Sequence, residues 1–461
     1  MRINKICLII FTCLFVLNFS VFSQDNEQPA AEFGLGLLLG VETFDPSVEG
    51  GDPETFQTLA LKPDLALGKF GIGLDLVLHY RFVSDTESGF DIREEDWIPQ
   101  GDQTILDLYL PKVSYVRWAY KGDPLYVKLG QIDDASMGTG FIVSNYSNTL
   151  FQPDEQIVGL NFDLDGQLFD FPYLGIETFI GNLARFDVFG GRLYSRPLLW
   201  TGVPIIKELE WGVSAAADLS PDLRSEFYDS ALNGGAEAET VLIYGTDLIL
   251  PILSFDAASL ALFGDLAFQD QNMGGMVGLG GRLFNILPYM FQLRILGDNF
   301  IPAYFDNTYD LYRGIKYDLL HYDAVAIPGS ISWLGNTGLS VLDDKLVFMA
   351  TLDGPFQAPP AGDKADHSFL EYPHLNAMLL IEEGLIPSFS FSASYDKKYI
   401  ASFAELFQGE DSMINMSINY LAGAAVISLS YDMVYIDDGV AGTNWEDYDV
   451  SSSLSCSIDL F

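Results

Sequence analysis

Apolar and polar residues alternate one by one in many separate segments of this chain. In residues 72–82 every second residue is apolar, and the positions between include Asp75, His79 and Arg81. Because successive side chains of a strand point to opposite faces, such a segment predicts a strand with one apolar and one polar face. The same period recurs in residues 106–118, 125–129, 158–165, 291–295, 414–420 and 427–435.

Composition restricts how these strands assemble. Hydrophobic residues make up 49% of the chain, yet no run beyond residue 23 approaches the roughly 18 apolar residues that a membrane helix needs. Several apolar faces span ten or more residues, whereas strands of soluble proteins have about five or six. Aromatic residues gather at segment ends, as at Trp118 and Tyr431. We therefore expect an all-β, transmembrane antiparallel β-barrel of about 18 strands, with a range of roughly 16 to 20.

The N-terminus has the pattern of a secretory signal peptide. Arg2 and Lys5 precede the apolar residues 6–19, and the small residues Val21 and Ser23 suit cleavage before Gln24. We expect residues 1–23 to be a cleaved signal and residues 24–461 to form a single barrel domain. Of three cysteines only Cys456 lies beyond the signal, so no intrachain disulfide is expected.

The chain is strongly acidic, with 64 Asp and Glu against 23 Lys and Arg. Such a surface repels the phosphate backbone, so nucleic acid is excluded as a partner. Polar connections also alternate in length. Short turns are expected at 121–124, 181–182, 343–344 and 382–384, and long acidic loops at 84–103, 219–239, 298–327 and 354–374. This alternation predicts short periplasmic turns and long outer loops.

The C-terminal segment 451–461 ends on the aromatic Phe461, as the closing strand of bacterial outer-membrane proteins does. Residues 129–132, followed by Asp133 and Asp134, are similar to porin regions that bend into the lumen. With the signal and the alternating strands, the mature chain resembles the porin-type bacterial outer-membrane β-barrel family. The resemblance implies a cell outer membrane location and a channel for passive or weakly selective diffusion. The partners it implies are outer-membrane lipid, the barrel assembly machinery, and small solutes or ions, and it is compatible with a homo-oligomer.

In a barrel the polar parity faces the lumen, which gives a set of candidate pore-lining residues. They are Asp75, His79, Arg81, Asp107, Tyr109, Arg117, Lys128, Asp163, Asp165, Arg192, Tyr194, Arg196, Glu210, Arg282, Arg294 and Asp432. Arg192, Tyr194 and Arg196 share one strand face and form a candidate ladder. With Asp133 and Asp134 on an infolded constriction loop, opposed charges would select solutes by charge. Alternatively, the inward charges pair with one another and only brace the wall.

Other functions have weaker support. The chain has four histidines, and none is placed by the sequence beside a nucleophile, so no enzyme activity and no catalytic residue is expected. Acidic clusters such as 94–96 lack the spacing of a calcium loop, and neither a metal site nor a cofactor is expected. Two alternatives to a diffusion channel stay open. One is a plugged transporter for hydrophobic solutes, and the other is a surface adhesin or structural barrel acting through its acidic loops.

Overall fold

The computed structural model describes residues 32–44, 54–82, 90–99, 105–150, 156–223, 238–255, 257–322, 327–342, 344–361, 364, 367, 369–423, 425–435 and 448–458. The expected signal peptide and Phe461 lie outside these residues. The first strands are β1 (Glu32–Phe44), β2 (Glu54–Leu67), β3 (Phe70–Leu74), β4 (Leu76–Phe82), β5 (Phe90–Ile92), β6 (Val113–Trp118), β7 (Leu125–Gly130), β8 (Gly159–Asp165), β9 (Leu174–Ile180), β10 (Val188–Ser195) and β11 (Glu210–Asp218). The remaining strands are β12 (Val241–Phe255), β13 (Ala258–Gln269), β14 (Asn272–Leu283), β15 (Leu287–Leu296), β16 (Ser330–Val341), β17 (Leu346–Pro355), β18 (His374–Ile386), β19 (Phe389–Lys397), β20 (Ser412–Ala422), β21 (Ala425–Tyr435) and β22 (Tyr448–Ile458).

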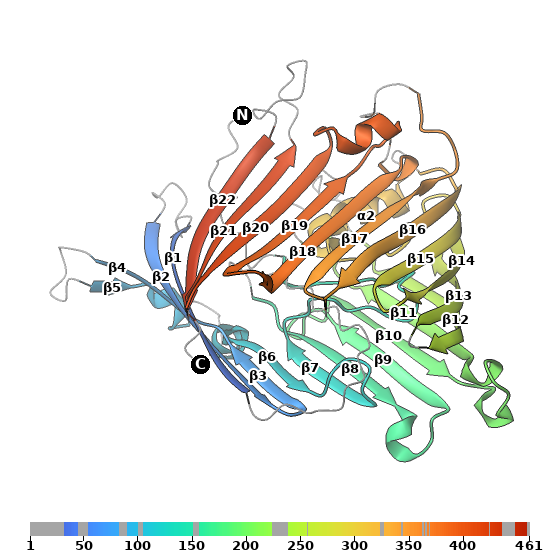
Figure 1. Ribbon diagram of the computed structural model, residues 1–461, viewed down its shortest axis with the longest axis horizontal. Coiled ribbons are helices and arrows are strands. Elements are labelled where there is room, and N and C mark those ends of the chain that lie inside the picture. Colours follow the sequence, from blue (N-terminus) through green and yellow to red (C-terminus); the bar gives the residue numbers. More distant parts are fainter. Residues whose placement is uncertain are drawn as a thin grey trace.

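The strands of the described residues belong to one sheet of 22 antiparallel segments. Apart from β3 and β4, and β5 and β6, neighbours along the chain pair with each other around the wall (Figure 1). The last strand returns to the first, with Leu38 opposite Ser457 and Leu39 opposite Cys456. β3 and β4 both pair with β2 and share one position in the wall. β6 pairs with β3 and β5 pairs with β4, so β5 and β6 share the next position. The 22 segments therefore occupy 20 strand positions around the wall, because β3 and β4 share one position and β5 and β6 share another. This number lies within the expected range of roughly 16 to 20 strands.

The outer face of this closed sheet is apolar. Along β12, Leu242, Tyr244 and Leu248 are about half exposed, whereas Ile243 and Asp247 between them are buried. The same alternation places Val213, Val277 and Ile295 outward on neighbouring strands. The apolar exterior of this closed sheet fits a hydrocarbon surround. The chain is thus a transmembrane antiparallel β-barrel, as the sequence predicts. Within the described residues no helix has the length and apolar character needed to cross a bilayer.

Connection lengths differ between the two ends of the barrel, with exceptions: the connection β10–β11 (196–209) is long and lies at the end of the tight turns, and the turn β13–β14 (270–271) lies at the end of the long loops. The turns β2–β3, β12–β13, β14–β15, β16–β17 and β18–β19 are tight, and the connections β7–β8, β11–β12, β15–β16 and β17–β18 leave the other end and are long. Two expected turns are wrong in place. Residues 382–384 lie inside β18 as a register irregularity between Ile381 and Ile386. Residues 181–182 belong to a short connection at the long-loop end.

One expected strand is also wrong. Residues 105–112 alternate in polarity, but they form the helix α1 (Ile105–Tyr109) and the 3-10 turn η2 (Leu110–Lys112). The reason is Pro111, which has no N–H for a sheet ladder and suits the start of a helical turn. Asp107 and Tyr109 therefore do not lie on a wall strand. The side chain of Asp107 lies outside the described residues, and Tyr109 is exposed and donates to Trp97 O at 2.8 Å.

Candidate functional site: a charged wall beneath two infolded segments

Two connections from the long-loop end pack against the inner face of the wall. The first is residues 131–148, and the second is residues 298–322, which include the helix α2 (Tyr309–His321; Figure 1). The two segments meet at Val143 and Phe305, which form an isolated parallel bridge. The apolar core that they form includes members of β9–β14, and none of its described members comes from β17–β22. The infolded segments therefore cover one part of the wall.

A buried ion cluster lies on this covered part. Arg192 on β10 is 1% exposed, and its guanidinium donates to both carboxylate oxygens of Asp247 on β12, at 2.9 and 2.6 Å. It also donates to Glu210 at 2.8 Å and lies 3.4 Å from Glu177. Such two-pronged contacts between arginine and carboxylate are strong and directional. One buried cation is thus surrounded by three carboxylates.

The expected ladder on β10 is present as a continuous charged row. Arg196 pairs with Asp165 at 2.8 Å and with Glu210 at 3.4 Å, so Glu210 links the two arginines. The Tyr194 ring lies between them, with guanidinium carbons 5.0 and 5.2 Å from its centroid. The residues predicted to share a face do meet, but carboxylates from neighbouring strands neutralise them.

The first infolded segment closes over the Arg192 cluster through Gly138. Gly138 N–H donates to Glu177 at 3.1 Å, and the next residue, Thr139, donates to Asp265 at 2.7 Å. A Cβ at position 138 would lie 2.8 Å from Arg192 Nε, and the φ of Gly138 is +53°. Only a glycine allows the backbone to approach the ion cluster this closely. The segment therefore shields the cluster from the rest of the lumen.

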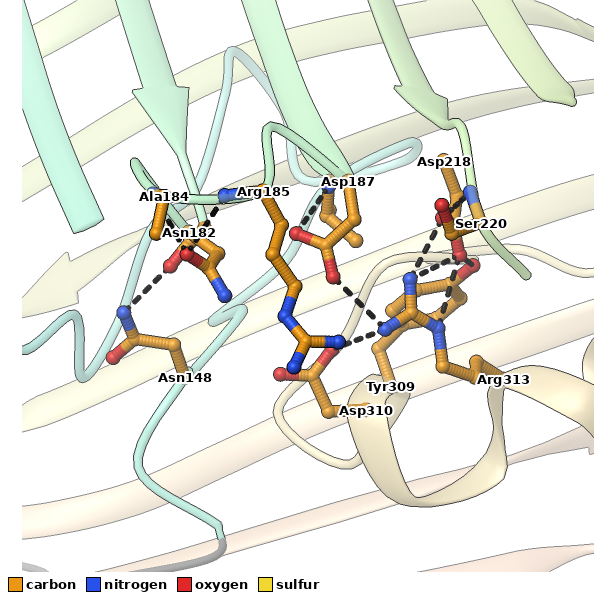
Figure 2. A network of polar contacts seen from close by, with 12 residues as sticks. Asn148, Asn182, Ala184, Arg185, Asp187, Asp218, Ser220, Tyr309, Asp310 and Arg313 are labelled. Carbon is orange, nitrogen blue, oxygen red and sulfur yellow. Dashed lines mark hydrogen bonds and ion pairs between the residues drawn. The ribbon is translucent and has the colours of Figure 1, made fainter. Parts of the chain in front are cut away.

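A second buried cluster fixes α2 to the wall (Figure 2). Arg313 on α2 donates through Nε and Nη2 to Asp218 at the end of β11, with distances from 2.7 to 3.1 Å, and through Nη1 to Asp187 at 3.2 Å. Tyr309, one helical turn earlier, donates to Asp218 at 2.6 Å. Arg313 is 1% exposed and Asp218 fully buried. The helix is thus held by charge-assisted hydrogen bonds between groups that are buried away from water.

Lys316 adds a further contact from α2. Its Nζ donates to Tyr304 O at 2.8 Å and pairs with Asp306 at 2.7 Å. Burial lowers the pKa of Lys316 from its ordinary value, and the Asp306 carboxylate opposes this shift.

The other sequence-predicted residues are distributed along the wall, and most of their charges are paired. The ion pairs are Lys62–Asp75 at 3.0 Å, Arg81–Asp91 at 2.7 Å, Lys128–Asp133 at 2.7 Å, Arg282–Asp344 at 3.1 Å and Arg294–Asp353 at 3.7 Å. His79 forms a hydrogen bond of 2.6 Å with Asp96. Arg117 donates to Ala119 O and lies 3.9 Å from the Tyr120 ring. Asp163 lines a small hollow with Lys121, Asp432 faces Asn415 across β20 and β21, and Asp134 is exposed. This geometry favours the wall-bracing alternative for many of these charges.

Sequence reasoning missed the partners that complete both clusters. Asp247 lies 55 residues from Arg192, and only the strand register brings them together. Arg313 lies in a stretch interpreted as a loop, although Tyr309, Arg313, Lys316 and Leu320 recur at helical spacing there. Among the described residues no group of three or more His, Cys, Asp or Glu side chains is placed to hold a metal ion.

Asp133 is the best test of whether the first infolded segment contacts permeating ions. Its carboxylate is 58% exposed and pairs with Lys128, so Asp133→Asn leaves that ammonium without its partner. We expect the reversal potential of reconstituted protein under a salt gradient to move toward anion preference. The unfolding free energy should change by less than about 1 kcal/mol, because exposed pairs contribute little. Asp134→Asn, next to it in the chain, shows whether the shift is specific to the pair with Lys128. A reversal potential of Asp133→Asn equal to that of the unmodified protein would exclude Asp133 from the ion path.

The closed strand pairing, the apolar outer face and the infolded segments define the class of this protein as a transmembrane β-barrel with a partly filled lumen. No family model matches the chain, and no curated protein matches it. Among solved structures, the chain is similar to OpdQ of Pseudomonas aeruginosa, with 9% identity over 94% of this chain and 98% of that chain and a TM-score of 0.33.

Two further structures are similar at the same level. One is the outer membrane protein OprD from Pseudomonas aeruginosa, with 10% identity over 93% of each chain and a TM-score of 0.31. The other is Wzi of Escherichia coli, described as a carbohydrate binding β-barrel, with 11% identity over 93% of this chain and 84% of that chain and a TM-score of 0.32. The expected likeness to porin-type barrels holds for the architecture, which the strand pairing itself establishes.

Proposed function

We propose that this protein is a porin-like channel of the cell outer membrane, through which small solutes or ions diffuse. One observation carries the proposal: a closed barrel has an apolar outer face, while its inner face carries charged, hydroxyl and amide side chains. A wide barrel with a polar interior holds water unless it is filled. Export by a cleaved signal, insertion by the barrel assembly machinery and assembly of several copies belong to the same proposal.

The infolded segments limit the size of what passes. They occupy the lumen beside β9–β14, where they share a buried apolar core with the wall. Since no described core member comes from β17–β22, the solute path is expected along that part of the wall. The conductance should therefore be lower than that of an unfilled barrel of the same strand number.

The test is single-channel recording of the refolded mature protein in a planar bilayer under a salt gradient. Stable current steps are expected, and the sign of the reversal potential gives the ion preference. A folded barrel that passes no current would refute the channel. It would favour the plugged transporter, because the packed core around Phe305 and Tyr309 would then fill the lumen completely.

A further inference from the structure

The register between neighbouring strands identifies the residues that lie on the same face of the wall as Arg192. Side chains opposite each other in an antiparallel ladder lie on the same face. From one strand to the next, the residues in register with Arg192 are Ser214, Gly245, Ala267, Gly274, Leu296 and finally Ser330 on β16. On that same parity, β16 to β20 carry Ser332, Asp353, His374, Asp396, Ser394 and Asn415. These residues therefore share the lumen-facing side of the wall.

A hollow of about 60 Å³ lies at one end of this face, between β15–β18 and residues 297–302 and 369–372. It has room for a few water molecules, and therefore for one hydroxyl-bearing edge of a solute. Ser332 lines it, is 7% exposed, and its hydroxyl has no hydrogen-bond partner. A buried hydroxyl without a partner is uncommon and needs an explanation. A solute hydroxyl in the hollow would supply the missing partner.

Charges in the hollow compensate one another. Arg294 donates to Gln292 at 2.9 Å and lies 3.7 Å from Asp353. Asp353 in turn lies 3.4 Å from His374, which is 2.9 Å from Asp396. Basic and acidic groups alternate along this row, so neither sign dominates. The aromatic rings of Phe300, Phe369 and Tyr372 complete the lining.

Beyond Asp396 the inward face becomes a grid of uncharged polar side chains. Ser390, Ser392 and Ser394 on β19 stand opposite Asn419, Ser417 and Asn415 on β20. Asn415 donates to Ser394 and Asn419 to Ser390, each at 3.0 Å, and Ser430 on β21 donates to Ser417 at 3.1 Å. A serine hydroxyl can both donate and accept, so the grid keeps hydrogen-bonding capacity for a solute.

We propose that the hollow and the adjoining Ser/Asn grid recognise uncharged, polyhydroxylated solutes. Hydroxyl-bearing solutes exchange hydrogen bonds with water for equivalent bonds with Ser332, the compensated row and the grid. A charged solute would leave water without meeting an uncompensated countercharge, which is unfavourable. The inference rests on the proposed channel function and adds the class of solute.

Three six-carbon pyranoses of different charge test the proposal: D-glucose, sodium D-glucuronate and D-glucosamine hydrochloride. Each is added to single channels of the full mature protein, and the dwell time of solute-induced current interruptions is measured. We expect dwell times for glucose to exceed those for the two charged probes by about fivefold or more, the equivalent of at least one neutral hydrogen bond. Ser332→Ala should shorten the glucose dwell time by about the same factor.

The control is Thr337→Val, which removes a hydroxyl from the opposite face of the same strand, β16, and should leave the dwell time unchanged. Because Ser332 has no partner in the protein, Ser332→Ala should not reduce the folded yield. Equal dwell times for all three probes, or longer ones for a charged probe, would overturn the solute class while the channel stands. Absence of any current would instead overturn the channel function on which the inference rests.

Discussion

Replacing Arg313 by methionine is expected to lower the free energy of unfolding by about 3–5 kcal/mol, because removing one partner of a buried ion cluster leaves charge without compensation. Asp218 is fully buried and Asp187 is 5% exposed, so neither carboxylate can recover its hydration. Both would lose a charge-assisted hydrogen bond from the same guanidinium. The measurement is denaturant unfolding of the refolded protein in detergent micelles, followed by tryptophan fluorescence.

Two variants make this result specific. Arg185→Met makes the same side-chain change at the same end of the barrel, where the side chain is exposed, and should change stability by less than about 0.5 kcal/mol. Asp218→Asn combined with Arg313→Met should recover part of the loss, since one of the uncompensated charges is then removed. Equal stabilities for Arg313→Met and Arg185→Met would mean that the cluster does not fasten α2.

Gly130→Ala is expected to destabilise the barrel by about 3 kcal/mol or more, through backbone strain and overpacking together. Gly130 ends β7 immediately before the first infolded segment, and its φ is +127°. A Cβ there would collide with Ser114 O and would lie 2.7 Å from Tyr115 Cα. These are backbone atoms of the neighbouring β6, which cannot move aside as a flexible side chain can. The readout is the midpoint of the same unfolding transition.

Gly122 supplies the matched control for this variant. Its φ of +95° is also positive, but nothing lies within 4 Å of a Cβ at that position. Gly122→Ala should therefore show the conformational penalty alone, about 1 kcal/mol. If both alanine variants unfolded at the same denaturant concentration, close packing at Gly130 would not contribute to the position of the first infolded segment.

Much of the wall follows from residue alternation. The apolar parity of β12 and the polar parity of β20 are visible in the sequence, because one face meets hydrocarbon and the other meets the lumen. The inward orientation of Arg192, Tyr194 and Arg196 follows from the same period. Residues 105–112 show where alternation misleads. The apolar and polar residues keep alternating up to Pro111, but a strand with a proline at that position cannot continue its hydrogen-bond ladder.

The filling of the lumen could not be obtained in this way. Val143 and Phe305 meet although they lie far apart in the chain, and no period in either segment indicates the contact. The partners of Arg192 depend on register across three strands, which the sequence leaves undetermined. A helical spacing in residues 309–321 was available, but a short helix among loop residues is a weak signal beside so many strands.

The seam of the barrel has a consequence for how the chain reaches its native state. Most strand pairs join neighbours in the chain, and the pairs β2–β4 and β3–β6 join strands close in the chain, whereas the seam joins β1 to β22. There the described register consists of Leu38 opposite Ser457 and Leu39 opposite Cys456. Sequential hairpins require only short loops to close, whereas the seam joins the two ends of the chain, for which the entropy loss is largest. Hairpins are therefore expected to form first and the seam last, and Cys456, the one cysteine beyond the expected signal, lies where labelling during refolding would report that final step.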